Sequence, residues 1–210
     1  PSLAANVLAV GGTSLRSQNG KLLSEVVWNQ AARQEGAGGG GISRVVGLPG
    51  YQQAAGISIP AADDGHLGRV DPDIALNADP LTGYAVITGI DSRNQPVFET
   101  VGGTSASTPL ATAGFALIGV LHGKKLGRVQ DALYTLAKAG HGIRDIVSGN
   151  NAYPLGAKGY PATVGFDAAS GWGAPKFAEL NHVWHRTVPT PAATQPTQPT
   201  PPAAAGMSLS

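Results

Sequence analysis

The feature that most constrains the fold of this chain is a glycine pair, Gly102-Gly103, between a strand-like segment and a long apolar segment. Residues 97–101 have the composition of a β-strand, and residues 105–122 predict a buried helix that is apolar all round. Ser105 lies at the junction, so its hydroxyl is expected on a sharp turn at the positive end of a helix. This position suits a nucleophile, because backbone N–H groups there can donate hydrogen bonds to the oxyanion that its attack creates. It equally suits an ordinary helix cap.

The composition of the 210-residue chain is that of one α/β domain with many tight turns. The chain contains 30 glycines and no cysteine, which excludes disulfides and thiolate chemistry. The formal net charge is +1 and the basic residues are scattered, so the sequence indicates no nucleic-acid surface. No apolar run has the length typical of a membrane span, and we expect none.

Turn residues and hydrophobic spacing divide the chain into short predicted elements. Residues 84–89 and 96–101 form a predicted β-hairpin that leads directly to the glycine pair. The other predicted elements are strands at 6–10 and 25–29, a polar turn at 14–20, and helices at 128–138 and 175–184. We expect residues 1–187 to form the domain and the Pro/Thr-rich residues 188–210 to form a linker or a disordered tail.

A second glycine run lies at residues 36–41, and its meaning is open. Such runs are often flexible linkers, but no serine or proline enrichment supports a tether here. The run is not a phosphate-binding loop, because no Gly-Lys-Ser/Thr follows it. Gly38, Gly39 and Gly40 could flank a bound peptide through main-chain pairing, or they could allow close packing of the chain.

The order of motifs along the chain resembles the sedolisin family, the serine-carboxyl peptidases with a subtilisin-like fold. The resemblance covers residues 6–184 and rests on Val-Gly-Gly-Thr at 10–13, Trp28, Gly-Gly-Gly-Gly-Ile-Ser at 38–43, Pro-Asp-Ile at 72–74 and Gly-Thr-Ser-x-x-x-Pro at 103–109. It implies a three-layer α/β fold with a mostly parallel sheet, of which this chain is the C-terminal part of the catalytic domain. It also implies that Ser105 is the nucleophile of a serine-type endopeptidase acting on peptide substrates.

Segments at 144–150 and 165–175 separate this resemblance from ordinary subtilisins. They imply one calcium ion, with carboxylate ligands from Asp145 and Asp167 and carbonyl ligands from Ile146, Thr163 and Gly165. Ca²⁺ prefers six or more oxygen ligands and accepts carboxylates and carbonyls together. Thr163 stands where the family pattern favours glycine, although a carbonyl ligand does not require one. Without the resemblance, the two aspartates would be interpreted as turn and cap residues.

A serine nucleophile needs a base, and this sequence offers none in the pattern of the family. In sedolisins a glutamate–aspartate pair and a separate oxyanion aspartate lie upstream of the Val-Gly-Gly-Thr element. Glu25 and Glu35 are followed at the fourth position by Asn29 and Gly39, so neither forms the pair. The resemblance therefore implies a partner, the N-terminal half of the same protease, as an upstream segment or a processed separate chain. That half would also cover the strand edge at residues 7–10.

The resemblance further implies a secreted enzyme that works at acid pH, where a protonated carboxyl group can donate a hydrogen bond. Two other functions remain open. The chain could be a fragment of an ordinary subtilisin that uses an upstream Asp and His, because Gly-Thr-Ser-x-x-x-Pro fits both families. It could also be a non-catalytic, calcium-stabilised pseudo-protease module, although the intact Ser105 argues against this.

Overall fold

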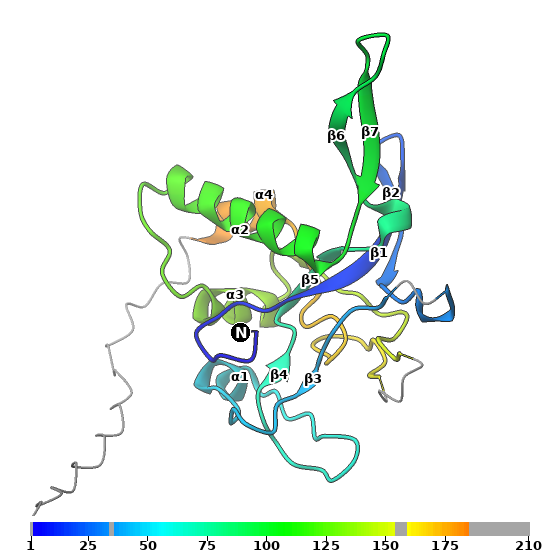
Figure 1. Ribbon diagram of the computed structural model, residues 1–210. Coiled ribbons are helices and arrows are strands. Elements are labelled where there is room, and N and C mark those ends of the chain that lie inside the picture. Colours follow the sequence, from blue (N-terminus) through cyan, green and yellow to red (C-terminus); the bar gives the residue numbers. More distant parts are fainter. Residues whose placement is uncertain (1, 34–35, 154–158, 185–210) are drawn as a thin grey trace, which may run out of the picture.

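The computed structural model describes residues 2–33, 36–153 and 159–184 (Figure 1). The largest sheet has three strands in the order β2-β1-β5, formed by Lys21–Val27, Val10–Gln18 and Ile74–Asn77. β1 runs parallel to β5, with Val10 opposite Ile74, and antiparallel to β2, with Thr13 opposite Val27. The predicted linker or tail at 188–210 lies outside the described residues.

β1 differs from the prediction at both of its ends. The strand expected at 6–10 starts only at Val10, and it continues to Gln18 through most of the residues expected to form a polar turn. The turn itself is Asn19-Gly20, whose φ angles of +51° and +73° are typical of two-residue hairpin turns. The second half of β1 is largely exposed and therefore carries polar side chains, which hid the strand from the sequence pattern.

The other named strands of the described residues form three antiparallel pairs. β3 (Gly41–Ile42) pairs with β4 (Val70–Asp71), β6 (Tyr84–Ile90) with β7 (Pro96–Val101), and β8 (Ile143–Arg144) with β9 (Ala174–Pro175). The β6–β7 hairpin confirms the sequence prediction and projects away from the body of the molecule in Figure 1. Nearly all of its side chains are exposed, including the opposed Ile87 and Phe98.

Helices pack around the sheet and form the main core. Their bounds are η1 (Ala31–Arg33), α1 (Gly50–Ala55), η2 (Pro80–Thr82), α2 (Thr104–Leu121), α3 (Gln130–Lys138) and α4 (Phe177–Val183). α2 and α3 confirm the two longer predicted helices. Phe115 of α2, Leu133 of α3 and Leu180 of α4 meet Ile74 of β5 in one buried cluster. Each such side chain contributes about 1.5–3 kcal/mol when it is buried.

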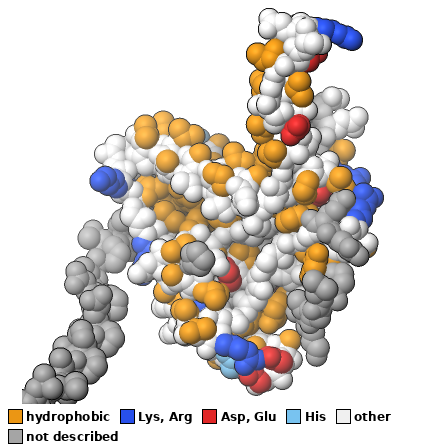
Figure 2. All heavy atoms as spheres, viewed as in Figure 1, with side chains coloured by type: hydrophobic (Ala, Val, Ile, Leu, Met, Phe, Trp, Pro, Cys, Tyr) orange, Lys and Arg blue, Asp and Glu red, His pale blue; other side chains and the backbone are white. Residues whose placement is uncertain are grey.

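α2 is buried on one face only, so the prediction of a helix buried all round is wrong. Ala111 and Ile118 are buried, whereas Leu117 and Val120 are 63% and 75% exposed. Figure 2 shows apolar side chains gathered along α2 and on the β6–β7 hairpin. When a helix is apolar on every face, its sequence does not specify which face packs against the core. α2 has the length and composition of a membrane span, a test that core helices also pass, and it packs against β1, β5 and α4.

A buried polar network fixes the segment that precedes β1. Arg69 and Asp73 form a fully buried ion pair at 2.8 Å. Asp73 also accepts hydrogen bonds from the Ala9 N–H and the Tyr134 hydroxyl, each at 2.7 Å. Arg69 donates to the Val7 carbonyl at 2.9 Å. These bonds satisfy charges that would be costly to bury alone, and they hold residues 7–9 in place at the start of β1.

Candidate active site

The turn that carries Ser105 is anchored to the end of β5. The Gly103 N–H donates to the Ala78 carbonyl at 2.5 Å, and the φ angle of Gly103 is +83°, a conformation that favours glycine. A side chain at Gly102 would place its Cβ 2.6 Å from both the Ala78 oxygen and the Pro80 nitrogen. Both glycines are therefore required, and the predicted strand–turn–helix arrangement is present.

Ser105 is the second residue of α2 and is exposed. Its hydroxyl makes no hydrogen bond within the described residues, and the N-cap of α2 is Gly103, so the cap interpretation of Ser105 is wrong. Ser107, by contrast, is buried and its hydroxyl donates to the Asn77 carbonyl at 2.8 Å. This bond ties the first turn of α2 to β5. This bond was not predictable from the sequence, because the only signal is one small polar residue in an apolar helix.

The surroundings of Ser105 suit an oxyanion. The first N–H groups of an α-helix lack intrahelical partners, and the helix dipole adds positive potential at that end. No carboxylate or imidazole in the described part of the chain hydrogen-bonds to Ser105. The Glu25 carboxylate already has other partners, since it accepts hydrogen bonds from the Thr13 hydroxyl at 2.7 Å and from Arg144 Nε at 2.8 Å. The described residues thus place no hydrogen-bonded base beside the Ser105 hydroxyl.

The predicted calcium ligands lie on two loops, one after β8 and one that ends at Asp167, which a hydrogen bond joins. Asp145 accepts a hydrogen bond from the Gly165 N–H at 2.7 Å, and Asp167 accepts one from the Thr163 N–H at 2.8 Å. Asp167 is buried, and its other oxygen accepts from Ser170 Oγ at 3.0 Å and from two backbone N–H groups. Burial raises the pKa of Asp167, while these hydrogen bonds oppose the rise. A cation beside this carboxylate would favour its ionised form.

The oxygen atoms on these two loops are of the types that calcium ligands have in proteins. Ile146 is buried against Val27 and Ala174, which fixes the backbone next to Asp145. Within the described ranges, no hydrogen bond is made to the carbonyl oxygens of Ile146, Thr163 and Gly165, which leaves them free to coordinate an ion. Two carboxylates and three carbonyls are the hard oxygen ligands that Ca²⁺ prefers.

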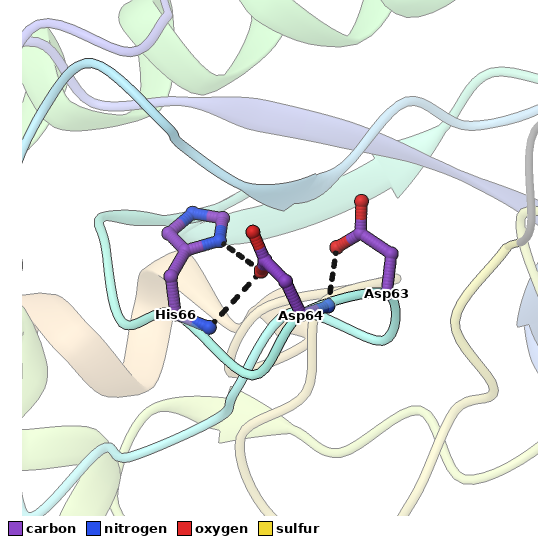
Figure 3. A group of neighbouring side chains, drawn as sticks. All are labelled: Asp63, Asp64 and His66. Carbon is purple, nitrogen blue, oxygen red and sulfur yellow. Dashed lines mark hydrogen bonds and ion pairs between the residues drawn. The ribbon is translucent and has the colours of Figure 1, made fainter.

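A separate acidic group, which the sequence analysis did not identify, lies at Asp63, Asp64 and His66 (Figure 3). His66 Nδ1 lies 2.8 Å from Asp64 Oδ1, and His66 Nε2 lies 3.1 Å from the Ser43 carbonyl. Arg44 forms ion pairs with both aspartates. The hydrogen bond between Asp64 and His66 raises the pKa of His66 and lowers that of Asp64. Since every charged group already has a partner, we interpret this group as an ion-paired surface loop.

The glycine run has two environments. A Cβ on Gly40 would lie 2.3 Å from the Ala168 carbonyl, and one on Gly38 would lie 3.2 Å from the Gly12 carbonyl. Close packing therefore explains these two glycines. A Cβ on Gly39 would have no atom within 4 Å, and the Gly39 carbonyl accepts from Asn151 Nδ2 at 3.0 Å. Only Gly39 of the three faces open space, so it alone requires another explanation.

Comparison with known proteins identifies the family. A model of the Peptidase_S8 family, described as the subtilase family, matches residues 1–173. Kumamolisin from Bacillus sp. (strain MN-32) is 39% identical over 175 residues, which cover 83% of this chain and 30% of that protein. Sedolisin from Pseudomonas sp. (strain 101) is 31% identical and is covered to 29% of its length, with 86% of this chain matched. The chain belongs to the sedolisin family of the subtilases.

The solved structure of Pseudomonas sedolisin, a serine-carboxyl proteinase complexed with two molecules of pseudo-iodotyrostatin, has the same fold. It matches with a TM-score of 0.71 and 29% identity, covering 89% of this chain and 48% of that chain. The predicted subtilisin-like α/β fold of a sedolisin is thereby confirmed. The chain spans about a third of the length of the curated relatives it matches.

Proposed function

We propose that this sedolisin-family chain forms part of an acid-acting serine-carboxyl endopeptidase in which Ser105 is the nucleophile. The observation that carries the proposal is the Ser105 hydroxyl itself. It is exposed, without a hydrogen-bond partner in the described residues, and held by Gly102 and Gly103 at the N-terminus of α2. A hydroxyl that is fixed in position yet unpaired is available to attack a carbonyl group.

In this proposal Ser105 Oγ attacks the scissile carbonyl and a glutamate from another segment takes the hydroxyl proton. The oxyanion is met by free N–H groups at the start of α2 and by a protonated carboxyl group from that same segment. The protonated glutamate then gives its proton to the leaving amine, and the acyl-enzyme is hydrolysed by water. A carboxyl group that must be protonated to donate its hydrogen bond restricts this chemistry to acid pH.

The partner is the N-terminal half of the same protease, as a continuous segment or a separate processed chain, and the assembled enzyme is secreted. Support comes from the relatives, which are peptidases about three times as long as this chain. One Ca²⁺ ion is bound by Asp145, Ile146, Thr163, Gly165 and Asp167. When bound, the ion supplies a cross-link between the two loops that carry these residues, and it takes no part in the reaction.

Labelling with a fluorophosphonate probe tests the role of Ser105. The chain is mixed with the part of kumamolisin that precedes its matching region, and complex formation is followed by size-exclusion chromatography. We expect one adduct, on Ser105, in the complex at pH 4, and much slower labelling of the chain alone. The Ser105→Ala variant should not react, whereas the control Thr108→Ala should.

A complex without a Ser105 adduct would favour the pseudo-protease. An ordinary subtilisin, which depends on a neutral histidine, would instead label fastest at neutral pH.

A further inference from the structure

A cavity of about 610 Å³ lies between the β1–β2 hairpin and η2, and no function is assigned to it above. We name it the η2 pocket. Its apolar walls come from Leu15 of β1, Leu23 of β2 and Leu81 of η2. Leu23 and Leu81 are 63% and 55% exposed, so the described residues leave both side chains largely uncovered. Three leucines from separate elements around one open cavity form a site for an apolar group.

The η2 pocket is packed against the turn that carries Ser105. Asp79 lines the pocket, and the carbonyl of the residue before it accepts from the Gly103 N–H at 2.5 Å. Pro80, the first residue of η2, lies so close to Gly102 that a Cβ there would be 2.6 Å from the proline nitrogen. An extended peptide advances about 3.3 Å per residue. A peptide attacked by Ser105 therefore has a side chain within reach of the pocket a few residues from its scissile bond.

The pocket is preformed, because a buried carboxylate joins its walls. One oxygen of Asp79 accepts from Ser14 Oγ at 2.6 Å and from Gln30 Nε2 at 3.0 Å. The other oxygen accepts from the Leu81 N–H at 2.9 Å. These bonds tie β1, the segment after β2 and η2 together. Because three donors already compensate the charge of Asp79, contact with the leucine walls decides what binds.

Arg16 adds a positive charge at the open side of the pocket. Its side chain lines the pocket and is exposed, and its guanidinium forms no ion pair with a described residue. A Lys or Arg side chain entering the pocket would be brought close to this like charge. The pocket therefore favours a neutral apolar side chain over a basic one.

We propose that the η2 pocket is a substrate subsite that holds one large apolar side chain, such as Leu or Phe, a few residues from the bond that Ser105 attacks. The inference rests on the proposed function and deepens it, since it names the class of peptide that the enzyme prefers. Leu15, Leu23 and Leu81 supply the contact area, and Arg16 excludes basic residues. A segment of the partner chain is the competing occupant, and the experiment separates the two.

Substrate profiling tests the subsite in the assembled enzyme, which is the chain mixed with the preceding part of kumamolisin. Internally quenched peptides carry Leu, Ser or Lys at each of several positions on either side of the cleaved bond. We expect one position at which Leu exceeds Ser at least tenfold in kcat/KM, since apolar pockets discriminate by about 10–200-fold. In Leu81→Ser this preference should fall at least fivefold, at that position alone. The matched control is Leu67→Ser, which changes a similarly exposed leucine of the surface loop and should leave the profile unchanged.

A charge reversal tests the role of Arg16. The assay is run at about pH 5, where a new glutamate is largely ionised. In Arg16→Glu, cleavage of the peptide with Lys at the selected position should rise at least fivefold relative to the Leu peptide, and added salt should reduce this effect. Arg93→Glu, in the exposed turn of the β6–β7 hairpin, is the control and should not alter the ratio. An unchanged ratio in Arg16→Glu would refute the exclusion of basic residues.

The outcomes of the profiling are distinct. An active enzyme whose preference is the same in the wild type and in Leu81→Ser overturns the subsite, while the proposed function stands. A complex that forms but neither reacts with the fluorophosphonate probe nor cleaves any peptide overturns the proposed function, and the inference fails with it. If Leu81→Ser weakens complex formation and Leu67→Ser does not, the partner chain occupies the pocket and the inference is wrong.

Discussion

Asp145 and Gly165 are joined by a 2.7 Å hydrogen bond from the Gly165 N–H to the Asp145 carboxylate, which brings the loop after β8 against the loop before Asp167. If calcium binds here, it links the two loops only in the folded chain. Chelation should then lower stability by mass action, by about 2.7 kcal/mol for a site at 100 times its dissociation constant. That corresponds to a fall in melting temperature of roughly 5–10 °C.

Differential scanning calorimetry with and without a chelator measures this shift. Asp145→Asn should abolish most of the chelator effect, because it removes one of two charged ligands. Asp131→Asn, on the exposed face of α3, provides the control. Equal melting temperatures in calcium and in chelator would contradict the metal site.

Gly102→Ala should disturb the turn that carries Ser105 without touching any charged group. The new Cβ would lie 2.6 Å from the Ala78 oxygen and from the Pro80 nitrogen, which are backbone atoms just after β5 and at the start of η2. We expect a loss of about 2–3 kcal/mol, as for overpacked sites, and slower fluorophosphonate labelling of Ser105 in the assembled enzyme. Gly89→Ala, in the β6–β7 hairpin, meets no atom within 4 Å and should leave both quantities unchanged.

Asp73→Ala should be among the most destabilising substitutions in the chain. It removes the partner of the fully buried Arg69 and two further hydrogen bonds, from Ala9 and Tyr134. Breaking a buried pair from one side costs about 3–5 kcal/mol, which urea denaturation can measure. Asp131→Ala breaks an exposed pair with Arg128 and should cost less than about 1 kcal/mol. Similar values for the two variants would contradict this account of the buried network.

His66 should titrate above its ordinary pKa of 6.5, because Asp64 hydrogen-bonds to its ring. A raised folded-state pKa means that the stabilising effect of His66 is complete below about pH 6.5 and is lost as pH rises through the folded-state value. The lowered pKa of Asp64 acts in the opposite sense. Its contribution to the stability of the fold is present above about pH 3.8 and is lost as pH falls through its folded-state pKa.

NMR titration of His66 checks this directly. In Asp64→Asn the pKa of His66 should fall back towards 6.5, while Asp63→Asn should change it little, since Asp63 does not contact the ring. A wild-type His66 that titrates at or below 6.5 would disprove the interaction shown in Figure 3.

Local signals in the sequence predicted the elements that depend on neighbouring residues. The β6–β7 hairpin was predictable because a turn lies between two strand-like runs, and Asn94 in that turn has a φ angle of +59°. The strand–turn–helix around Ser105 was predictable from its glycine pair. These features are set within a few residues of the chain.

Features that depend on distant partners were not predictable. The ion pair of Glu25 with Arg144 spans 119 positions of sequence, and neither residue stands in a recognisable pattern. The exposed face of α2 could not be inferred, because every face of that helix is apolar. The candidate calcium ligands were predicted only from the family resemblance, since two aspartates near glycines are common in ordinary turns.

The apolar β6–β7 hairpin has a practical consequence for the chain on its own. A two-stranded ribbon is at best marginally stable in water, and this one exposes Ile87 and Phe98 together with its backbone edges. Such edges pair readily with those of other molecules. Solutions of the isolated chain should therefore show concentration-dependent self-association, and charged substitutions in the hairpin should improve its colloidal behaviour.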